Sequence, residues 1–307
     1  MSETQPQTVK AVGIEAAADK LTAVCIGPDA GDNTPYTVEL VSGEANLPQL
    51  IEFIGSLSAK FGGLERLGIA VPGLVHRETK RVALSIQNPE HSDLDLAESI
   101  RSAAGITPVI ENDANAAAFG EFRLGAGRDS KDMFYATIGH GVGGAFILDG
   151  RIWHGAAGFA GEFGYIALNS DGLRLEDVAS TENIVRRTRT RFNRDSTSSL
   201  NKLPETSIHI GDIIAAAENG DDFAQLMLER TGMYVGTAVA TVINLLNIER
   251  VVIGGAIMHA QHLVLDAVIK RAQELSFDPS FAGTEIVAGQ LGESAAATGA
   301  ALLAAQT

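Results

Sequence analysis

Residues 109–122, which read VIENDANAAAFGEF, decide the fold that the sequence predicts. The first two residues are β-branched, as in a strand, whereas the alanine-rich run that begins at Ala114 has high helix propensity. The junction between strand and helix contains four polar residues, Glu111, Asn112, Asp113 and Asn115. A strand that passes directly into a helix is the building unit of an α/β protein.

The polar junction is also a candidate site. Asn112 or Asp113 is expected to cap the helix, because a side-chain oxygen at that position accepts a hydrogen bond from a free helix N–H. Ligands of open α/β sheets bind where strands end and helices begin, and the helix dipole there keeps a carboxylate ionised. A ligand hydroxyl within hydrogen-bond reach could lose its proton to Asp113, which is therefore the candidate general base. A capping aspartate without a chemical role is the alternative.

A glycine-rich turn follows at residues 137–150, TIGHGVGGAFILDG, between two strand-like arms. Gly139, Gly141, Gly143 and Gly144 let the backbone fold tightly and present N–H groups to an anion, so phosphate is the expected ligand. The turn is not a Walker A loop, because no Gly-Lys-Ser/Thr follows, and it is not a dinucleotide fingerprint, because no helix follows. A tight hairpin without a ligand is the alternative.

Two glutamates and a glycine pair complete the set of candidates. Glu162 and Glu176 are flanked by glycine or apolar residues, where a carboxylate is costly unless it is hydrogen-bonded, and sugar hydroxyls are good donors to it. Gly254 and Gly255 end a strand-like run at which a nucleobase or ribose could approach the backbone. The alternatives are a surface or capping role for each glutamate and a plain turn for the glycines.

Strand-like and helix-like runs alternate along the chain, which predicts an α/β layered fold. At 307 residues the chain is longer than one compact core usually supports, so two domains are expected, residues 1–127 and 128–307, with the helix at 292–307 packing back on the first. The strand-like runs are residues 9–16, 20–27, 36–43, 66–75, 108–113, 133–155 and 250–257. The helix-like runs are residues 46–61, 93–105, 114–126, 175–192, 210–220, 223–247 and 292–305.

The amino-acid composition limits the classes of protein to which the chain can belong. Hydrophobic residues make up 45% of the chain, as in an ordinary globular enzyme, and 23 basic against 38 acidic residues give a net charge of −15, which disfavours nucleic acid as a partner. The basic run at residues 186–194 is interpreted as a solvated helix face, with a phosphate or partner patch as the alternative. The single cysteine, Cys25, excludes an internal disulfide and multi-cysteine zinc sites.

The sequence also predicts where the protein functions. The first ten residues lack the apolar core of a signal peptide, so a cytoplasmic location is expected. The apolar run at residues 233–258 is interrupted near its middle by polar and charged residues. It therefore predicts a buried helix followed by a buried strand, and no membrane partner is expected.

Taken together, these segments resemble the sugar kinases of the ROK family, in the actin-like ATPase superfamily. The similarity extends from AVPGLV at residues 70–75 to LGESAAATGAALLA at residues 291–304, with the segments in the family's order. The resemblance implies a two-domain actin-like, or ribonuclease H-like, α/β fold with an interdomain cleft. It also implies a sugar substrate, ATP and Mg²⁺ as cofactors, and a homodimer.

The resemblance assigns a role to each candidate residue. Asp113 matches the catalytic base that deprotonates the sugar hydroxyl attacked by the γ-phosphate of ATP. Asn112, Glu162 and Glu176 match positions that bind sugar hydroxyls. The phosphate-loop and adenosine-turn positions of the family match Gly139, His140, Gly141, Gly143, Gly144, Gly254 and Gly255.

The sequence departs from the family pattern in three places. Residues 13–20, GIEAAADK, replace a phosphate loop that usually reads Asp-x-Gly-Gly-Thr, which puts Glu15 at the acid position and alanines at the glycines. Glu15 can still hold Mg²⁺ directly or through water, whereas alanine Cβ atoms disfavour φ > 0 and crowd a phosphate. His140 replaces a threonine. Tyr165 replaces the sugar-binding histidine of the GExGH motif, and the cysteines that follow it in the family are absent, so no zinc site is expected.

Two hypotheses about function follow. The first is an ATP- and Mg²⁺-dependent kinase of a hexose or sugar-like polyol, with Asp113 as base and Glu15 as magnesium ligand. The second is a sugar-binding protein that transfers no phosphate and acts as a sensor or partner subunit, which the altered residues 13–20 suggest. A DNA-binding repressor is not expected, because the sequence has no basic helix-turn-helix ahead of the kinase-like segments.

Overall fold

The computed structural model describes residues 10–27, 34–192 and 196–307. The chain forms two compact units: unit 1 contains Met1–Arg128, Phe146–Ala160 and Glu293–Thr307, and unit 2 contains Asp129–Ala145 and Gly161–Gly292. This division differs from the single boundary expected after residue 127, because Phe146–Ala160 groups with unit 1. Hydrogen bonds explain the difference, since the Arg77 N–H donates to the Ala157 carbonyl at 2.8 Å within unit 1. Of the first ten residues, on which the prediction of location was based, only Lys10 lies within the described residues.

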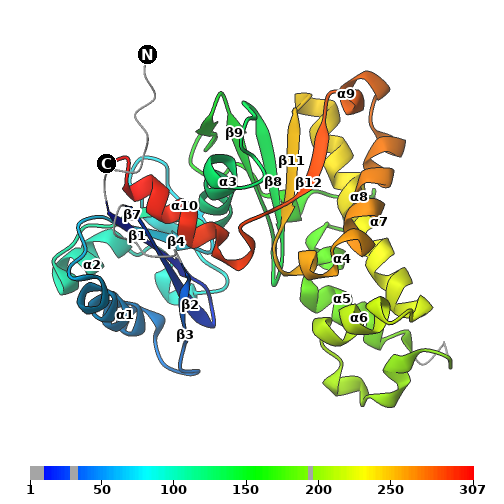
Figure 1. The fold of residues 1–307 in the computed structure, drawn as a ribbon, viewed down its shortest axis with the longest axis horizontal. Coiled ribbons are helices and arrows are strands. Elements are labelled where there is room, and N and C mark those ends of the chain that lie inside the picture. Colours follow the sequence, from blue (N-terminus) through cyan, green and yellow to red (C-terminus); the bar gives the residue numbers. More distant parts are fainter. Residues whose placement is uncertain (1–9, 28–33, 193–195) are drawn as a thin grey trace. The chain divides into compact units, whose positions relative to one another are not determined.

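Unit 1 is built on a five-stranded sheet in the order β3-β2-β1-β4-β7. β1 (Ala11–Ala16), β2 (Lys20–Ile26) and β3 (Tyr36–Glu39) are antiparallel neighbours, and β4 (Leu67–Val71) and β7 (Val109–Asn112) extend the sheet in parallel. Strands were expected at all five places. α1 (Asn46–Phe61) and α2 (Leu96–Ala104) lie on one side of this sheet (Figure 1). Their apolar side chains are buried together with sheet residues such as Ile14 and Ile69.

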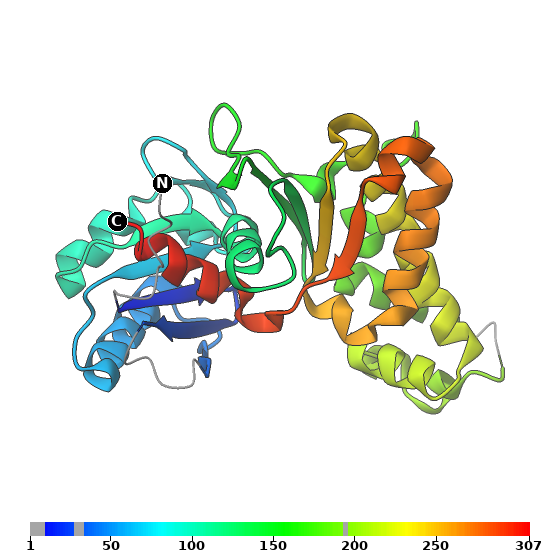
Figure 2. The ribbon, with the colours of Figure 1, turned by 45° about the horizontal axis from the view of Figure 1, so that its top comes forward.

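The opposite face of this sheet is covered by α10 (Ala295–Ala304), which also packs along α3 (Asp113–Leu124), as Figures 1 and 2 show. The approach is close because small residues meet backbone. A Cβ atom on Gly13 of β1 would lie 1.9 Å from the Ala297 carbonyl oxygen, and one on Gly299 would lie 1.7 Å from the Ala116 carbonyl oxygen. The alanine-rich sequences of α3 and α10 are therefore a packing requirement as well as a helix signal.

Two further pieces of unit 1 lie near the end of β7. A short hairpin of β5 (Leu74–Val75) and β6 (Val82–Leu84) follows β4. β10 (Arg151–Ile152) leads into a loop at residues 153–160, which the Ala160 N–H closes by donating to the His154 carbonyl at 3.2 Å.

Unit 2 is built around a second five-stranded sheet in the order β10-β9-β8-β11-β12, in which β10 and the end of β9 come from the segment grouped with unit 1. β8 (Met133–Ile138), β11 (Arg250–Gly254) and β12 (Glu285–Ala288) are parallel, and β9 (Val142–Leu148) carries β10 as its antiparallel neighbour. The helices are α4 (Glu176–Ala179), α5 (Thr181–Arg189), α6 (Ile210–Glu218), α7 (Asp222–Leu246), α8 (His262–Leu275) and α9 (Asp278–Ala282).

The apolar run at residues 233–258 forms the end of α7 and then β11, as the sequence predicted. Over the ranges that the structure covers, none of the helices is both long and apolar enough to cross a bilayer. The sequence prediction had no element between residues 258 and 291, where α8, α9 and β12 lie. The signal was present, because α8 buries Val264, Ala267, Val268 and Ala272 at helical spacing.

The close contact of α10 with α3 predicts opposite effects of one substitution at two glycines. Gly299→Ala should lower the free energy of unfolding by about 1–3 kcal/mol, because the added methyl group overpacks the interface. Gly55→Ala, in the exposed middle of α1 where a Cβ meets nothing within 4 Å, should raise it by roughly 0.5–1 kcal/mol through helix propensity. Urea unfolding midpoints of both variants provide the measurement, and a Gly299→Ala protein as stable as the native chain would contradict the packing described.

Candidate active site

The strand-to-helix junction places Asp113 as the first residue of α3, with Asn112 as its N-cap. The Asn112 side-chain oxygen accepts from the Asn115 N–H at 3.0 Å, which decides between the two capping residues that the sequence allowed. The Asp113 carboxylate accepts from the Ala114 N–H at 2.8 Å and from Asn112 Nδ2 at 2.9 Å. Asn112 Nδ2 also donates to the Gly73 carbonyl at 2.9 Å. These bonds fix the orientation of Asp113 at the positive end of the helix dipole.

Glu111 is buried one residue before the cap, and its carboxylate is fully engaged. Its oxygens lie 2.8 Å from His154 Nε2 and 3.4 Å from Lys80 Nζ, and they accept from Asn115 Nδ2 and from the Asn112 N–H, both at 3.0 Å. Burial alone would raise the pKa of Glu111, but the His154 hydrogen bond and the Lys80 charge lower it to about 2. Glu111 is therefore a buried anion that holds its surroundings together.

Glu15 lies near the end of β1, close enough to Asp113 for their charges to interact. Burial, together with repulsion from Asp113, raises the pKa of Glu15 from 4.5 to about 7. Asp19 and Glu293 add negative charge, and Lys20 opposes it while forming an ion pair with Glu293 at 2.8 Å. Two carboxylates that repel each other are suited to bind a cation.

The turn between β1 and β2 avoids the strain that its alanines would create. Within the described residues, neither Ala17 nor Ala18 has a positive φ angle. The turn therefore does not use the left-handed backbone that glycines would permit.

Glu162 and Glu176 lie close together in unit 2. Glu162 precedes the short helix Phe163–Tyr165, and Glu176 begins α4, where its carboxylate accepts from the Val142 N–H at 2.9 Å. Burial and the charge of Glu176 raise the pKa of Glu162 above its ordinary value. The two carboxylates therefore form one acidic patch beside the first residue of β9.

A hairpin at residues 166–175 connects the segment that contains Glu162 to the helix that begins at Glu176. Leu175 N–H donates to the Ile166 carbonyl at 3.0 Å, and the Asn169 side chain closes the turn by accepting from the Asp171 and Leu173 N–H groups. Tyr165 is 50% exposed, and the Arg174 guanidinium lies 4.4 Å from its ring centroid. Hydrogen bonds and this cation–π contact thus hold the hairpin closed. Within the described part of the chain, no cluster of three or more His, Cys, Asp or Glu side chains is arranged to hold a metal.

The glycine-rich turn connects β8 to β9, and Thr181 of α5 anchors it. The Gly139 carbonyl accepts from the Thr181 N–H at 2.8 Å and from its hydroxyl at 3.1 Å. Added Cβ atoms meet different surroundings along the turn: one on Gly139 would have nothing within 4 Å, whereas one on Gly144 would lie 2.8 Å from the Phe163 Cβ. Gly139 is therefore open to a ligand, and Gly144 is required by packing.

A cavity of about 490 Å³ adjoins this turn. Its lining residues belong to α5, the start of α6 and nearby loops, and they include His140, Thr181, Val185, Arg189 and His209. The His140 side chain is 71% exposed and lies 3.7 Å from a Glu182 oxygen. The cavity is large enough for part of a small ligand.

Gly254 and Gly255 end β11 against the end of β8. A Cβ on Gly254 would lie 2.3 Å from the Tyr135 hydroxyl. Gly255 has φ +85°, and a Cβ there would lie 2.5 Å from the Ile138 carbonyl oxygen. Packing alone therefore explains both glycines, and a ligand contact would be additional.

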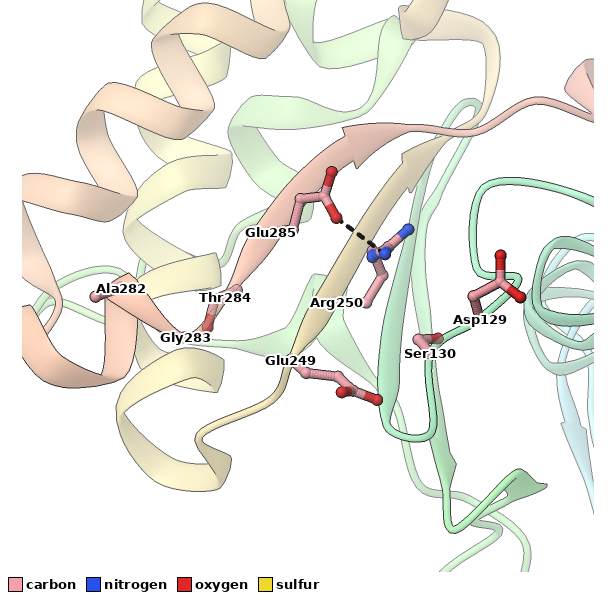
Figure 3. Close-up of a pocket in the computed structure, with 8 residues that line it drawn as sticks. All are labelled: Asp129, Ser130, Glu249, Arg250, Ala282, Gly283, Thr284 and Glu285. Carbon is pink, nitrogen blue, oxygen red and sulfur yellow. Dashed lines mark ion pairs between the residues drawn. The ribbon is translucent and has the colours of Figure 1, made fainter.

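A second cavity, of about 290 Å³, lies at the other end of β11 (Figure 3). Arg250 and Glu285, the first residues of β11 and β12, line it and form an ion pair at 2.9 Å. None of the candidate site residues lines this cavity.

The candidate residues thus form two groups. Unit 1 contains Asn112, Asp113 and Glu15, and the last two lie close enough for their charges to repel each other. Unit 2 contains the glutamate pair with Tyr165, the glycine-rich turn with His140, and Gly254–Gly255. Sequence reasoning missed His154 and Lys80, because nothing in their local sequence indicates a contact with Glu111.

The fold and these residues define a protein of the actin-like ATPase class. The chain belongs to the ROK family, whose model matches residues 12–307. The predictions of this family and fold are confirmed. A crystal structure of a ROK family glucokinase from Streptomyces griseus in complex with glucose and AMPPNP is similar, with a TM-score of 0.85 and 27% identity, over 97% of this chain and 100% of that one.

Related sequences include both enzymes and regulators. A glucokinase of Thermotoga maritima is 33% identical over 249 residues, which cover 76% of this chain and 77% of that enzyme. A xylose repressor of Bacillus subtilis is 26% identical over 273 residues, which cover 83% of this chain and 67% of the repressor. The relationship to glucokinases supports sugar kinase activity, and the repressors leave a regulatory role open.

The raised pKa of Glu15 predicts how stability changes with pH. The stability that neutral Glu15 provides is complete below pH 4.5 and is lost as the pH rises through about 7. Glu15→Gln should therefore be more stable than the native chain above pH 7, by up to about 3 kcal/mol at about 1.4 kcal/mol per pKa unit. The difference should disappear below about pH 4.5. Denaturant unfolding from pH 4 to pH 8 measures it, and a pH-independent difference would contradict the burial and repulsion assigned to Glu15.

Proposed function

We propose that the protein is an ATP- and Mg²⁺-dependent kinase that phosphorylates a hydroxyl of a hexose or sugar-like polyol. The observation that carries the proposal is the Asp113 carboxylate, oriented by Asn112 and Ala114 at the start of α3 in a chain related to glucokinases. Such a group can accept the proton of an attacking alcohol, and phosphoryl transfer otherwise needs mainly positioning and charge neutralisation.

Sugar hydroxyls are assigned to Asn112, Glu162, Glu176 and Tyr165. The neighbouring glutamates offer acceptors. Burial and the charge of Glu176 raise the pKa of Glu162, and bound hydroxyl donors would compensate for both. Tyr165 presents a half-exposed ring and a phenol group. These groups support binding of a polyol without identifying the sugar.

The donor phosphates are assigned to the turn at residues 139–144, with His140 at its exposed edge. The open space above Gly139 and the adjoining cavity of about 490 Å³ support a nucleotide in this part of unit 2. Gly254 and Gly255 are assigned to the adenosine side.

Glu15 is the proposed magnesium ligand. Mg²⁺ is usually held by one or two carboxylates together with water and substrate phosphates, so a single carboxylate such as Glu15 can serve as its protein ligand. The repulsion between Glu15 and Asp113 fits a divalent cation, which supplies neutralisation of the phosphate charge when bound. Glu15 must be ionised to bind it, so the affinity for Mg²⁺ should rise with pH up to about 7.

The same acids favour a second candidate function, a sugar-binding sensor or partner subunit that transfers no phosphate. Glu15, Asp19, Glu293 and Asp113 all contribute negative charge near the turn that would face the triphosphate in the family. Lys20 is occupied by Glu293. If this charge repels nucleotide, the chain would bind sugar alone.

We propose that the protein forms a homodimer and that it acts in the cytoplasm, where ATP is supplied. Size-exclusion chromatography with light scattering would measure the assembly.

Asp113→Asn should lower kcat by at least about 100-fold, because the amide cannot accept a proton, while its oxygen can keep the bonds from Asn112 and Ala114. Sugar affinity should change by less than about threefold, since the same hydrogen-bonding shape remains. Steady-state kinetics over a sugar panel and calorimetry with sugar and with ATP·Mg²⁺ test both statements. Native turnover in the variant would remove Asp113 as the base, and sugar binding without nucleotide binding in the native chain would favour the second candidate.

A further inference from the structure

Three segments of unit 1 meet at the buried carboxylate of Glu111. The first is the end of β7 with the start of α3, which provides the Asn112 N–H and Asn115 Nδ2. The second is the β5–β6 hairpin, which provides Lys80 from a turn in which this residue has φ +54°. The third is the loop at residues 153–160, which provides His154. A buried anion keeps its charge only when its donors are in place, so Glu111 holds these segments in one arrangement.

The loop and the hairpin also contact each other directly. The Arg77 N–H donates to the Ala157 carbonyl at 2.8 Å, and the His76 and Phe159 rings lie 5.0 Å apart. Gly158, with φ +112°, leaves room for the hairpin, because a Cβ there would lie 2.3 Å from the Val75 carbonyl oxygen. The loop that contains His154 is thus held against the hairpin by several separate contacts, none of which involves Glu111.

Glu111 accepts hydrogen bonds from the residues that orient Asp113. Glu111 accepts from the N–H of Asn112, whose side chain donates to the Asp113 carboxylate at 2.9 Å. It also accepts from the side chain of Asn115, whose N–H donates to the Asn112 oxygen. Releasing Glu111 would remove one hydrogen bond from Asn112 and one from Asn115 at the same time.

We infer that His154 and Glu111 are positioning residues for Asp113: the 2.8 Å contact between them fixes Asn112, and Asn112 fixes the carboxylate that receives the sugar proton. This inference rests on the proposed kinase function. Lys80 contributes less, because its side chain is 40% exposed and lies 3.4 Å away. His154 is the better point of intervention, because it can be replaced without changing the sequence around the base.

The kinetic test compares His154→Ala with His154→Gln. His154→Ala should lower kcat by about 10- to 100-fold and change KM for the sugar by a smaller factor, because the base is misaligned while the sugar contacts assigned to Glu162, Glu176 and Tyr165 remain. His154→Gln should recover most of the loss, because its amide Nε2 can donate to Glu111. His76→Ala is the matched control: it alters the same loop–hairpin contact without touching Glu111, and it should keep native kcat. Equal losses of kcat in His76→Ala and His154→Ala, or no loss in His154→Ala, would overturn the inference.

A double-mutant comparison separates positioning from general damage. In the Asp113→Asn background, His154→Ala should cause no further loss of the residual kcat, since there is no base left to orient. Additive losses would mean that His154 acts independently of Asp113, which would contradict the inference.

A measurement without turnover distinguishes this inference from the kinase proposal. Carboxyl-carbon NMR identifies Asp113 as the resonance missing from Asp113→Asn. In His154→Ala the titration midpoint of Asp113 should rise by about 0.5 pH unit or more, because the Asn112 donor becomes less well held. The midpoint should return toward the native value in His154→Gln. All samples carry Glu15→Gln, so that the titration of Glu15 does not contribute to that of Asp113. An unmoved midpoint would refute the positioning role; a moved midpoint in a chain that phosphorylates no sugar would refute the kinase proposal alone.

Discussion

The hydrogen bonds at the end of β7 are the constraint on which the chemistry of unit 1 depends. Asn112 caps α3 with its side-chain oxygen and donates to Asp113 with its side-chain nitrogen. One asparagine therefore satisfies the helix terminus and orients the adjacent carboxylate at the same time. The helix itself is held against the sheet by α10, whose small residues allow the backbones to approach closely.

Unit 1 also contains two carboxyl groups whose pKa values are shifted in opposite directions. The same unit contains Glu111, which its donors keep ionised, and Glu15, which burial and Asp113 hold partly protonated near neutral pH. The difference arises from partners: Glu111 has hydrogen-bond donors on both oxygens, whereas Glu15 faces other acids. A cation near Glu15 would bring it to the ionised state, so a divalent ion and the ionisation of this residue are expected to be linked.

The sequence predicted those parts of the fold that residue type and spacing along the chain determine. The strand-to-helix junction, the opening meander of strands and α1 follow from residue type and spacing, and they agree with the structure. Asn112 as the cap and the hairpin at residues 166–175 were harder, because the first depends on side-chain geometry and the second lacks a distinctive motif. The helix α8 was missed although its apolar residues have helical spacing. His154 could not have been linked to Glu111 from the sequence, since 43 residues separate them and only packing brings them together.

The most direct test of the central claim is to follow the products by ³¹P NMR when the protein is mixed with ATP, Mg²⁺ and each of a panel of hexoses. A sugar kinase should convert ATP into ADP and a sugar phosphate ester in equal amounts, and the ester signal should be absent when Asp113→Asn replaces the native chain. Intact ATP with every sugar, at protein concentrations where sugar binding is measurable, would contradict the account.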